Sequence, residues 1–484
     1  MACLIAAPAS GSGKTLLSLS LAALARRRNL RLQPFKVGPD YLDPQLLSRV
    51  SGLSCRNLDP LLCGEAWLQH SFTWHAGRAD LALVEGVMGL FDGRGASSEG
   101  SSAAVATLLK LPVVLVVDAS RQGNSVAALV RGFRDHGPPQ VSLAGVVLNR
   151  VGSSRHVDLL REALAGISIP VLGALPRREV LEVPSRHLGL LPPGELDNLE
   201  TRIDAWAALA EQHLDLQLLW PLLSTPPRAP DGIDPIQWLL SKSSAHGNQK
   251  PVQQKASQPL AVAVASDAAF HFRYPEASEL LEACGLIPRA WSPLADDPLP
   301  PDATAVVLPG GYPELHAAQL ASSQRSLAAL QTAHATGLPM VAECGGMLLL
   351  GQQLGDPQGV RHRMAGLLPF SAAAGPLQLG YRRATALVDG LLVRRGEQLM
   401  GHEFHRWALQ PMARKENLWQ LDGWAIQPRV EGWTKPKVHA SWLHLHWAGC
   451  PQIPWRLAAE ARKVDRLAWN AASEPQTAAS AGDC

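Results

Sequence analysis

Short apolar runs recur along the first half of the chain and alternate with longer segments that have helix-like spacing. The runs read CLIAAP, LQPFKVG, LALVEGVMG, PVVLVVDAS, LAGVVLNRV and PVLGALP. Strands that alternate with helices in this way predict a parallel sheet with right-handed crossover connections. Ligands of such sheets bind beyond the carboxyl ends of the strands, where the polar candidates of this half lie. The pattern therefore predicts an α/β domain with its site at that edge of the sheet.

The apolar pattern stops in a polar segment and then starts again. Residues 223–258 contain STPPRAPDG and SKSSAHGNQKPVQQKASQ, which are rich in proline, serine and glutamine and have no periodicity, as is typical of a linker. A new apolar run, LAVAVASD, is followed by AVVLPGG, LPMVAECGG and KVHASWLHLHW. We therefore predict two α/β domains at 1–222 and 259–470, a linker at 223–258 and a disordered tail at 471–484.

Composition narrows the class of protein. The 484 residues are 46% hydrophobic and 18% charged, as in ordinary globular proteins, and the formal net charge of +2 predicts no field that would attract nucleic acid or an anionic membrane. The seven cysteines are scattered without paired spacing, which argues against a disulfide framework or a zinc site. No apolar run reaches the length of about 18 residues that a membrane span needs. We therefore expect a cytoplasmic protein that binds neither nucleic acid nor membrane.

The first apolar run leads into the glycine-rich stretch PASGSGKT and then into a helix expected from about Lys14. Such a strand, turn and helix resembles a P-loop, in which backbone N–H groups and the lysine bind nucleotide phosphates. The chain departs from the strict pattern, because Pro8 stands where the first glycine is expected. The alternative is a glycine-rich turn that caps an ordinary helix, whereas a secretory leader is not expected because no charge precedes Lys14. The predicted phosphate-binding residues are Gly11, Ser12, Gly13, Lys14 and Thr15.

Charged residues follow the second and third apolar runs. PFKVGPDYLDP places Lys36, Asp40 and Asp43 after the second strand, and VEGVMGLFDG places Glu85 and Asp92 after the third. Carboxylates beside a phosphate loop suit Mg²⁺, which prefers oxygen ligands, and they suit a polar substrate. The alternative is that GPDYLDP and LFDG are only turns, where Asp and Pro are favoured. That alternative is weakest for Glu85, because a carboxylate at the end of a buried strand costs free energy unless a cation pairs with it.

Two later strand ends carry Asp118, in VVDASRQGN, and Asn149, in VVLNRV. The Asn149 amide has the donor and acceptor groups to bind an adenine edge. The alternative is an asparagine whose hydrogen bonds are satisfied within the protein. Asn149 and Lys36 are counted among the predicted nucleotide-binding residues.

The second half carries a candidate nucleophile in MVAECGGMLLL. Cys344 lies at a tight turn between an apolar run and a helix-like segment, which resembles a nucleophile elbow, where the helix N-terminus lowers the pKa of a thiol. Upstream, VVLPGGYPE places Gly310 and Gly311 at another strand end, where their N–H groups would stabilise an oxyanion. A cysteine without such neighbours is ordinarily a buried hydrophobe. The segment HASWLHLHW supplies three candidates for the base: His439, His444 and His446.

Taken together, these motifs resemble one enzyme family over nearly the whole chain. Their order is PASGSGKT, KVGPDYLDP, EGVMGLFDG, PSRHLGL, SDAAFHFRYPE, LPGGYPELHA, AECGGM, LGYR, GHEFHR and SWLHLHW. A P-loop amide synthetase followed by a class I glutamine amidotransferase, with these motifs, is similar to the cobyrinate or hydrogenobyrinate a,c-diamide synthase family. Only the linker and the tail match nothing in that family.

The resemblance implies roles for residues of the second half. Cys344 would be the glutaminase nucleophile and His444 its base, with the N–H groups of Gly310 and Gly311 at the oxyanion. Class I amidotransferases usually have a glutamate two residues after that histidine, where this chain has His446, and this family is similar in lacking it. The group that orients His444 is therefore not identified by the sequence.

For the first half, the resemblance implies that ATP activates a carboxylate. A carboxylate is a poor electrophile, so amidation would proceed through an acyl phosphate, with Lys14 neutralising charge on the β- and γ-phosphates of ATP. Glutamine supplies the ammonia, and the substrate is a corrinoid whose a and c side-chain carboxylates are both amidated. The predicted Mg²⁺ ligands are Thr15, Glu85 and Asp40. The groups predicted to orient the carboxylate and to manage the proton lost by ammonia are Asp40, Asp43 and Asp92.

Other functions remain as alternatives. One alternative is cobyric acid synthase, which amidates four other side chains, and the motifs KVGPDYLDP and GHEFHR argue against it. Another alternative is a nickel-sirohydrochlorin a,c-diamide synthase, from which these motifs distinguish the chain less clearly. A ParA-like assembly ATPase shares the phosphate loop, and a dethiobiotin synthetase-like enzyme shares the first half, but neither explains Cys344. The sequence leaves open a homodimer, the presence of cobalt in the corrinoid, and the order of the two amidations.

Overall fold

The computed structural model describes residues 2–177, 185–186, 189–190, 192–228, 232–245, 259–411, 417–465 and 469. The chain forms two compact units, Met1–Trp238 and Leu239–Cys484. The boundary lies inside the predicted linker, where helix α10 (Pro235–Ala245) was not predicted. The predicted tail lies outside the described residues, as does part of the motif PSRHLGL.

The first unit is built on a seven-stranded sheet with strand order β3-β2-β4-β1-β5-β6-β7, in which every strand pair is parallel. This confirms the predicted parallel α/β domain, since each apolar run of the first half forms one strand. Strand β3 was not predicted, because its three residues form no apolar run. The strands are β1 (Cys3–Ala6), β2 (Leu32–Val37), β3 (Arg56–Leu58), β4 (Leu81–Glu85), β5 (Val113–Asp118), β6 (Leu143–Val151) and β7 (Val171–Pro176).

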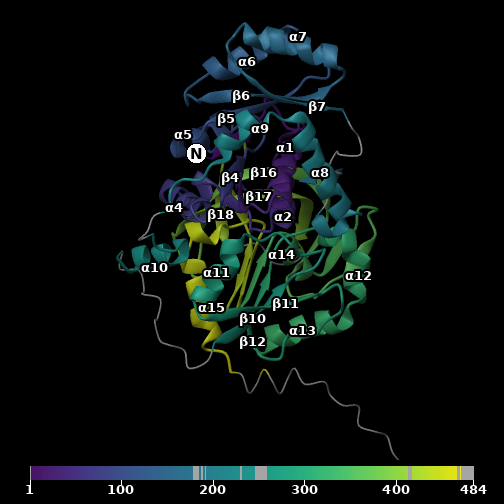
Figure 1. Cartoon of the computed structure of the whole chain (residues 1–484). Coiled ribbons are helices and arrows are strands. Elements are labelled where there is room, and N and C mark those ends of the chain that lie inside the picture. The colour runs from purple at the N-terminus through teal and green to yellow at the C-terminus, as the bar shows by residue number, and fades with distance from the viewer. Residues whose placement is uncertain are drawn as a thin grey trace, which may run out of the picture. The chain divides into compact units, whose positions relative to one another are not determined.

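Helices cover both faces of this sheet (Figure 1). They are α1 (Lys14–Arg27), α2 (Leu42–Ser51), α3 (Pro60–Cys63), α4 (Glu65–Ala76), α5 (Ser102–Leu109), α6 (Ser125–Asp135), α7 (Ser154–Ala165), α8 (Leu199–His213), α9 (Leu216–Leu219), and the 3₁₀ turns η2 (Pro193–Glu195) and η3 (Trp220–Leu223), with a small hairpin of β8 (Ser185–Arg186) and β9 (Gly189–Leu190). Successive strand residues point to opposite faces. Ile5 and Val116 therefore pack with α1 and α8, whereas Leu4 and Leu115 pack with α5 and α6.

The second unit has a central sheet with strand order β11-β10-β12-β13-β21-β20, in which β20 is antiparallel and the other pairs are parallel. The predicted runs form β10, β12, β13 and β21, while β11 and β20 were not predicted. The strands are β10 (Leu260–Ala265), β11 (Leu286–Trp291), β12 (Ala303–Leu308), β13 (Met340–Glu343), β20 (Trp433–Lys435) and β21 (Val438–Ser441). The helices are α11 (Pro275–Ala283), α12 (Ala317–Ser322), α13 (Gln324–Ala335), α14 (Gly345–Leu349), α15 (Gln452–Ala461), η4 (Pro313–His316) and η5 (Trp447–Gly449).

A further, largely antiparallel sheet in the second unit was not predicted at all. Its order is β15-β14-β16-β18-β19, and β17 pairs with β16. Strand β16 contains many small and polar residues and therefore gives no apolar run. The strands are β14 (Gln353–Gly355), β15 (Arg361–Arg363), β16 (Phe370–Ala386), β17 (Gln398–Pro411), β18 (Trp419–Asp422) and β19 (Arg429–Glu431).

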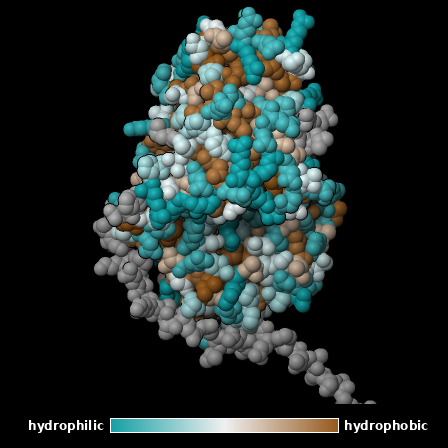
Figure 2. All heavy atoms as spheres, in the orientation of Figure 1, coloured by the Kyte–Doolittle hydropathy of each residue, from teal (hydrophilic) through white to brown (hydrophobic). Residues whose placement is uncertain are grey.

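The surface drawn in Figure 2 mixes hydrophilic and hydrophobic residues over the whole visible face. Single exposed apolar side chains such as Trp424 and Val360 are ordinary features of a protein surface. Within the described part of the chain, no helix is long and apolar enough to cross a membrane.

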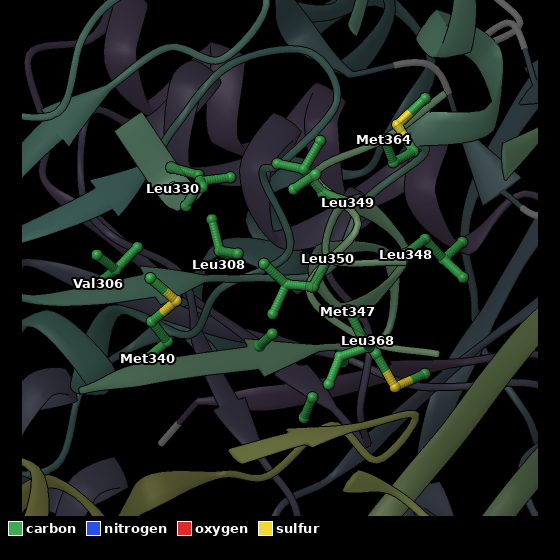
Figure 3. Close-up of a cluster of buried hydrophobic side chains, with 14 of the residues drawn as sticks. Val306, Leu308, Leu330, Met340, Met347, Leu348, Leu349, Leu350, Met364 and Leu368 are labelled. Atoms are coloured by element: carbon green, nitrogen blue, oxygen red, sulfur yellow. The ribbon is translucent and has the colours of Figure 1, made fainter. Parts of the chain in front are cut away.

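An apolar cluster in the second unit fixes the turn between β13 and α14. Cys344 belongs to this cluster, together with Leu308 of β12 and Met340 of β13. Figure 3 shows the side chains of Leu308, Met340 and Leu350 gathered there. Because protein interiors are close-packed, the backbone around Cys344 has little freedom to move.

Candidate active sites

The loop between β1 and α1 has a geometry that suits phosphate binding. Gly13 precedes α1 with a φ of 109°, which favours glycine. Asn149 of β6 lies so close that a Cβ on Gly13 would be 2.2 Å from the Asn149 side-chain nitrogen. The same nitrogen donates a hydrogen bond to the Ser12 carbonyl oxygen at 2.9 Å. Asn149 therefore braces the loop, and its contact with adenine stays a prediction.

The first two side chains of α1 bind groups at the end of β4. The Lys14 ammonium, largely buried, donates to the Met88 carbonyl oxygen at 2.5 Å, and the Thr15 hydroxyl donates to Glu85 Oε1 at 2.8 Å. Burial and then the positive charge of Lys36 lower the pKa of Lys14 to about 8. An anion beside Lys14 would raise this pKa again. The start of α1 is therefore suited to receive a phosphate group.

Lys36 lies at the centre of three of the predicted carboxylates. Its Nζ is 2.5 Å from Asp43 Oδ2, 2.9 Å from Glu85 Oε1 and 3.7 Å from Asp40 Oδ2. The sheet creates this arrangement, because Lys36 on β2 stands opposite Glu85 on β4. Burial alone would lower the pKa of Lys36, but the charges of Asp43, Glu85 and Asp40 raise it well above its ordinary value. The structure thus brings these four residues together in one cluster.

The residues of this cluster fit a magnesium ion. Glu85 is fully buried, and its Oε2 atom receives no hydrogen bond from the described residues, while Oε1 accepts from Thr15 and Lys36. Burial raises the pKa of Glu85, an effect that a cation at Oε2 would oppose. Among the described residues, no group of three or more His, Cys, Asp or Glu side chains forms a metal cluster. That result is compatible with Mg²⁺, which uses one or two carboxylates together with water and phosphate oxygens.

Asp92 and Asp118 have other partners. Asp92 Oδ2 accepts a hydrogen bond from the Gly89 N–H at 2.8 Å, and its negative charge acts on Lys14. Asp118 Oδ2 is 2.6 Å from Arg150 Nη1, which also donates to the Gly11 carbonyl oxygen at 3.2 Å. Both carboxylates therefore lie near the phosphate loop.

Cys344 occupies a sharp turn at the end of β13. Its φ of 45° and ψ of −111° match neither helix nor strand, as is typical of a strained elbow. The Cys344 N–H donates to the Ser441 carbonyl oxygen at 2.7 Å, and Sγ lies 3.8 Å from the Phe404 carbonyl oxygen. The lowered thiol pKa expected from the elbow is wrong, because burial and then the charge of Glu314 raise the pKa well above its ordinary value. The thiol therefore needs a base before it can attack an amide.

The Gly310–Gly311 pair lies between Cys344 and His444. A Cβ on Gly345, the residue after Cys344, would be 3.0 Å from the Gly311 nitrogen. A Cβ on Gly310 would be 2.4 Å from Cε1 of the His444 ring. These close approaches require the small glycine residues, and they bring Cys344, the glycine pair and His444 into one site.

His444 is the candidate base that contacts the glycine pair. The side chain is fully buried, and burial, followed by the neighbouring His402, lowers its pKa to about 3. The imidazole is therefore neutral near pH 7, as a general base must be before it accepts a proton. The backbone holds it firmly, because the N–H of each of the two histidines donates to the carbonyl oxygen of the other, at 2.9 and 3.0 Å.

The other two candidate histidines have different surroundings. The His439 ring packs edge-on against Trp419, with ring centroids 5.8 Å apart. The His446 ring lies 4.3 Å from the Tyr274 ring, and its Nε2 is 3.6 Å from Glu276 Oε2. Position 446, where class I amidotransferases usually have a glutamate, is a histidine in this chain. The carboxylate next to it is that of Glu276 in α11.

Strand β17 forms a part of the site to which the sequence assigned no role. The Phe404 carbonyl oxygen faces the Cys344 thiol, and the His402 backbone pairs with His444. Both residues belong to GHEFHR, which is one of the motifs shared with the family. That shared motif was the signal in the sequence that could have indicated a role for this strand. Backbone atoms make the contacts, which is why residue type alone did not reveal them.

A buried ion cluster holds this part of β17. Glu403 is fully buried and binds Arg382 Nε at 2.8 Å, His405 Nε2 at 3.1 Å, and Arg429. Burial would raise the pKa of Glu403, but His405 and Arg429 hold it at about 2. The charged carboxylate therefore fixes the strand next to Cys344 and His444.

Two family models match the chain. The CobQ/CobB/MinD/ParA nucleotide binding domain matches residues 3–191, and the CobB/CobQ-like glutamine amidotransferase domain matches residues 261–451. Over 449 residues, the chain is 43% identical to the cobyrinate a,c-diamide synthase of Gloeobacter violaceus, and the match covers 92% of this chain and 94% of that protein. The chain belongs to the cobyrinate a,c-diamide synthase family.

Further members of the cobyrinate a,c-diamide synthase family are similar over nearly their whole length. The enzyme of Synechococcus sp. is 41% identical, with 94% of this chain and 96% of that protein covered. A hydrogenobyrinate a,c-diamide synthase of Streptomyces coelicolor is 40% identical, with 95% and 97% covered. The predicted family, the pairing of a nucleotide-binding with an amidotransferase domain, and the glutamine-hydrolysing ligase class are thereby confirmed. The roles of individual residues stay predictions.

Proposed function

We propose that the protein amidates the a and c side-chain carboxylates of cobyrinate, with ATP to activate each carboxylate and glutamine as the nitrogen source. The observation that carries the proposal is the convergence of Cys344, the Gly310–Gly311 pair and His444 in the amidotransferase unit. The nucleotide-binding unit supports the other half, because Lys14 and Thr15 begin α1 beside a cluster of carboxylates. Relatives that match nearly the whole chain carry this activity in their names.

The second unit would release ammonia from glutamine. His444 takes the proton of the Cys344 thiol, and the sulfur attacks the side-chain amide carbon. The N–H groups of Gly310 and Gly311 stabilise the negative charge on the carbonyl oxygen. The carbon–nitrogen bond then breaks as His444 returns the proton to the leaving nitrogen, which departs as ammonia. Water hydrolyses the thioester to glutamate and restores the thiol.

The first unit would activate the substrate. A corrinoid carboxylate attacks the γ-phosphorus of ATP, which gives an acyl phosphate and ADP, while Lys14 stabilises charge on the phosphates. Ammonia attacks the acyl carbon, and phosphate leaves. We assign Asp40, Asp43 and Asp92 to orientation of the carboxylate and acceptance of the proton from nitrogen.

Thr15, Glu85 and Asp40 would hold Mg²⁺ in this unit. The ion supplies positive charge that neutralises the phosphates and orients them for transfer. Lys36 pairs with two of these residues and balances their charge within the cluster.

Cys344→Ala tests the proposal. The variant should lose synthesis with glutamine but keep it with ammonium salts at raised pH, where free NH₃ is present. The measurement is mass spectrometry of the amides formed from cobyrinate, with nickel-sirohydrochlorin as a second substrate. The matched control is Cys450→Ala, since Cys450 is another buried thiol of this unit and donates to the His446 carbonyl oxygen. The control should keep both activities.

Two results would contradict the proposal. One is glutamine-dependent synthesis by Cys344→Ala, and the other is a folded Cys344→Ala protein that also fails with ammonia. A preference for nickel-sirohydrochlorin would keep the amidotransferase chemistry but change the substrate.

A further inference from the structure

Glu314 is a buried carboxyl group beside the glutaminase site, and hydrolysis by Cys344 and His444 does not by itself require it. Glu314 lies in η4, shortly after the Gly310–Gly311 pair, and is 7% exposed. The preceding residue, Pro313, contacts the turn that holds Cys344, since a Cβ on Gly345 would be 2.7 Å from Pro313 Cδ. Glu314 is therefore part of the structure that surrounds the thiol.

No cation balances this carboxylate within the described part of the chain. Burial raises the pKa of Glu314 to about 7, and no neighbouring charge opposes that effect. Glu403, by contrast, is buried on the same unit but pairs with two arginines. A buried carboxylate without a counter-charge costs free energy, so the site favours a ligand that brings a positive charge.

The charge of Glu314 also acts on the catalytic thiol. Besides burial, three carboxylates raise the pKa of Cys344, and Glu314 has the largest effect. It acts more strongly than Glu343, which is the neighbour of Cys344 in the sequence, and more strongly than Glu403. The geometry agrees with this effect, because η4, which contains Glu314, packs against α14, the helix that begins directly after Cys344.

We propose that the Glu314 carboxylate binds the α-ammonium group of glutamine, an inference that rests on the proposed role of Cys344 as the glutaminase nucleophile. The ammonium group of glutamine is four bonds away from the amide carbon that Cys344 attacks, so a carboxylate beside the thiol lies within its reach. The pair would form a charge-assisted hydrogen bond in a site that excludes water. This contact would select free glutamine over amides that lack an α-ammonium group.

Binding would also connect recognition to chemistry. The ammonium group balances the charge of Glu314 and thereby removes one cause of the raised pKa of the Cys344 thiol. The thiol then transfers its proton to His444 more readily when glutamine is bound. In the absence of glutamine, the thiol stays protonated and poorly reactive.

The test compares glutamine with glutaramate, which has the same carboxylate and side-chain amide but no α-ammonium group. Ammonia release by the full-length protein is measured for both compounds. Glu314→Gln should lower kcat/KM for glutamine by about 10- to 150-fold, as expected for one hydrogen bond to a charged group, and change that for glutaramate by less than about threefold. The matched control is Glu282→Gln, which removes an exposed carboxylate of α11 and should leave both values unchanged.

The rate of alkylation of Cys344 is a second measurement. A purely structural role of Glu314 would not make this rate increase in the variant. Without glutamine and at a fixed pH, iodoacetamide should modify Glu314→Gln faster than the wild type, because loss of the negative charge lowers the thiol pKa. Slower or equal alkylation would count against the proposal. Glutaramate hydrolysis by the same preparation, which needs Cys344 and His444 but not the ammonium contact, reports whether the second unit of the variant is folded.

The wild type alone can overturn the inference, even if the variant fails to fold. Hydrolysis of glutaramate as efficiently as glutamine would show that no residue recognises the ammonium group. Equal losses for both compounds in Glu314→Gln would also overturn it. Failure of the proposed function is a separate result, namely glutaminase activity that survives Cys344→Ala.

Discussion

Replacement of Gly310 by alanine tests the contact between the glycine pair and His444. The new Cβ would lie 2.4 Å from Cε1 of the His444 ring, whereas carbon atoms pack at about 3.5–4.0 Å. The loop or the ring must therefore move by about 1 Å or more. His444 cannot move freely, because it is fully buried and its backbone N–H and carbonyl groups are both bonded to His402.

A shift of about 1 Å at a catalytic group costs about 100-fold in rate. We therefore expect Gly310→Ala to lower kcat for glutamine hydrolysis by about that factor, while amidation with ammonia stays near the wild-type rate. The assay measures ammonia release from glutamine and, separately, diamide formation with ammonium salts. Gly355→Ala is the matched control, because its Cβ would have no contact shorter than 3.3 Å. This control should keep both activities.

Two outcomes would refute this reasoning. Gly310→Ala with a glutaminase rate within about threefold of the wild type would show that the glycine pair does not position His444. Equal loss of the glutamine-dependent and ammonia-dependent activities would show that the damage is not confined to the glutaminase site.

Three further predictions follow from buried ionisable groups. Lys14→Ala and Glu85→Gln should each abolish amidation with glutamine and with ammonia, because activation by ATP precedes both routes; near-normal diamide formation in the mass spectrum would contradict this. Glu403→Gln should lower the free energy of unfolding by about 3–5 kcal/mol, because it leaves the buried Arg382 without its counter-charge. Urea denaturation measures this change, and a decrease of less than about 1 kcal/mol would contradict the prediction. Burial lowers the pKa of His439 from 6.5 to about 4, so between these pH values the unfolded chain binds more protons than the folded protein. The free energy of unfolding is therefore unaffected by this group above pH 6.5 and decreases as the pH falls below 6.5. At pH 5 the loss is about 2 kcal/mol, and His439→Gln should be less acid-sensitive by that amount when urea transitions at pH 7 and 5 are compared.

The parallel sheet of the first unit could be predicted because its strands are buried on both faces. Such strands must be apolar along their whole length, so β4 and β5 appear in the sequence as continuous runs. The phosphate loop could be predicted for a similar local reason. The backbone at Gly13 needs a glycine, and the motif GSGKT records that need in consecutive residues.

The antiparallel sheet of the second unit could not be predicted, because its strands are only partly buried. Strand β16 includes Gly375, Gln378 and Arg382, and its stability comes from pairing with β17 and not from an apolar run. For the same reason the contact of the Phe404 carbonyl group with Cys344 was missed. A backbone carbonyl group is present in every residue, so only its place in the fold distinguishes it.

The sequence by itself determined which residues are candidates for the chemistry, since the glycine-rich loop, the strand-end carboxylates and the Cys344 turn are each encoded within a few neighbouring positions. Only the tertiary structure decided which of them meet. Lys36 pairs with Glu85 because β2 lies beside β4. His444, which follows β21, reaches the glycine pair, which follows β12, because only β13 separates these two strands in the sheet. The physical reason is that local patterns record whether a side chain is buried, whereas the order of strands in a sheet depends on packing among all of them at once.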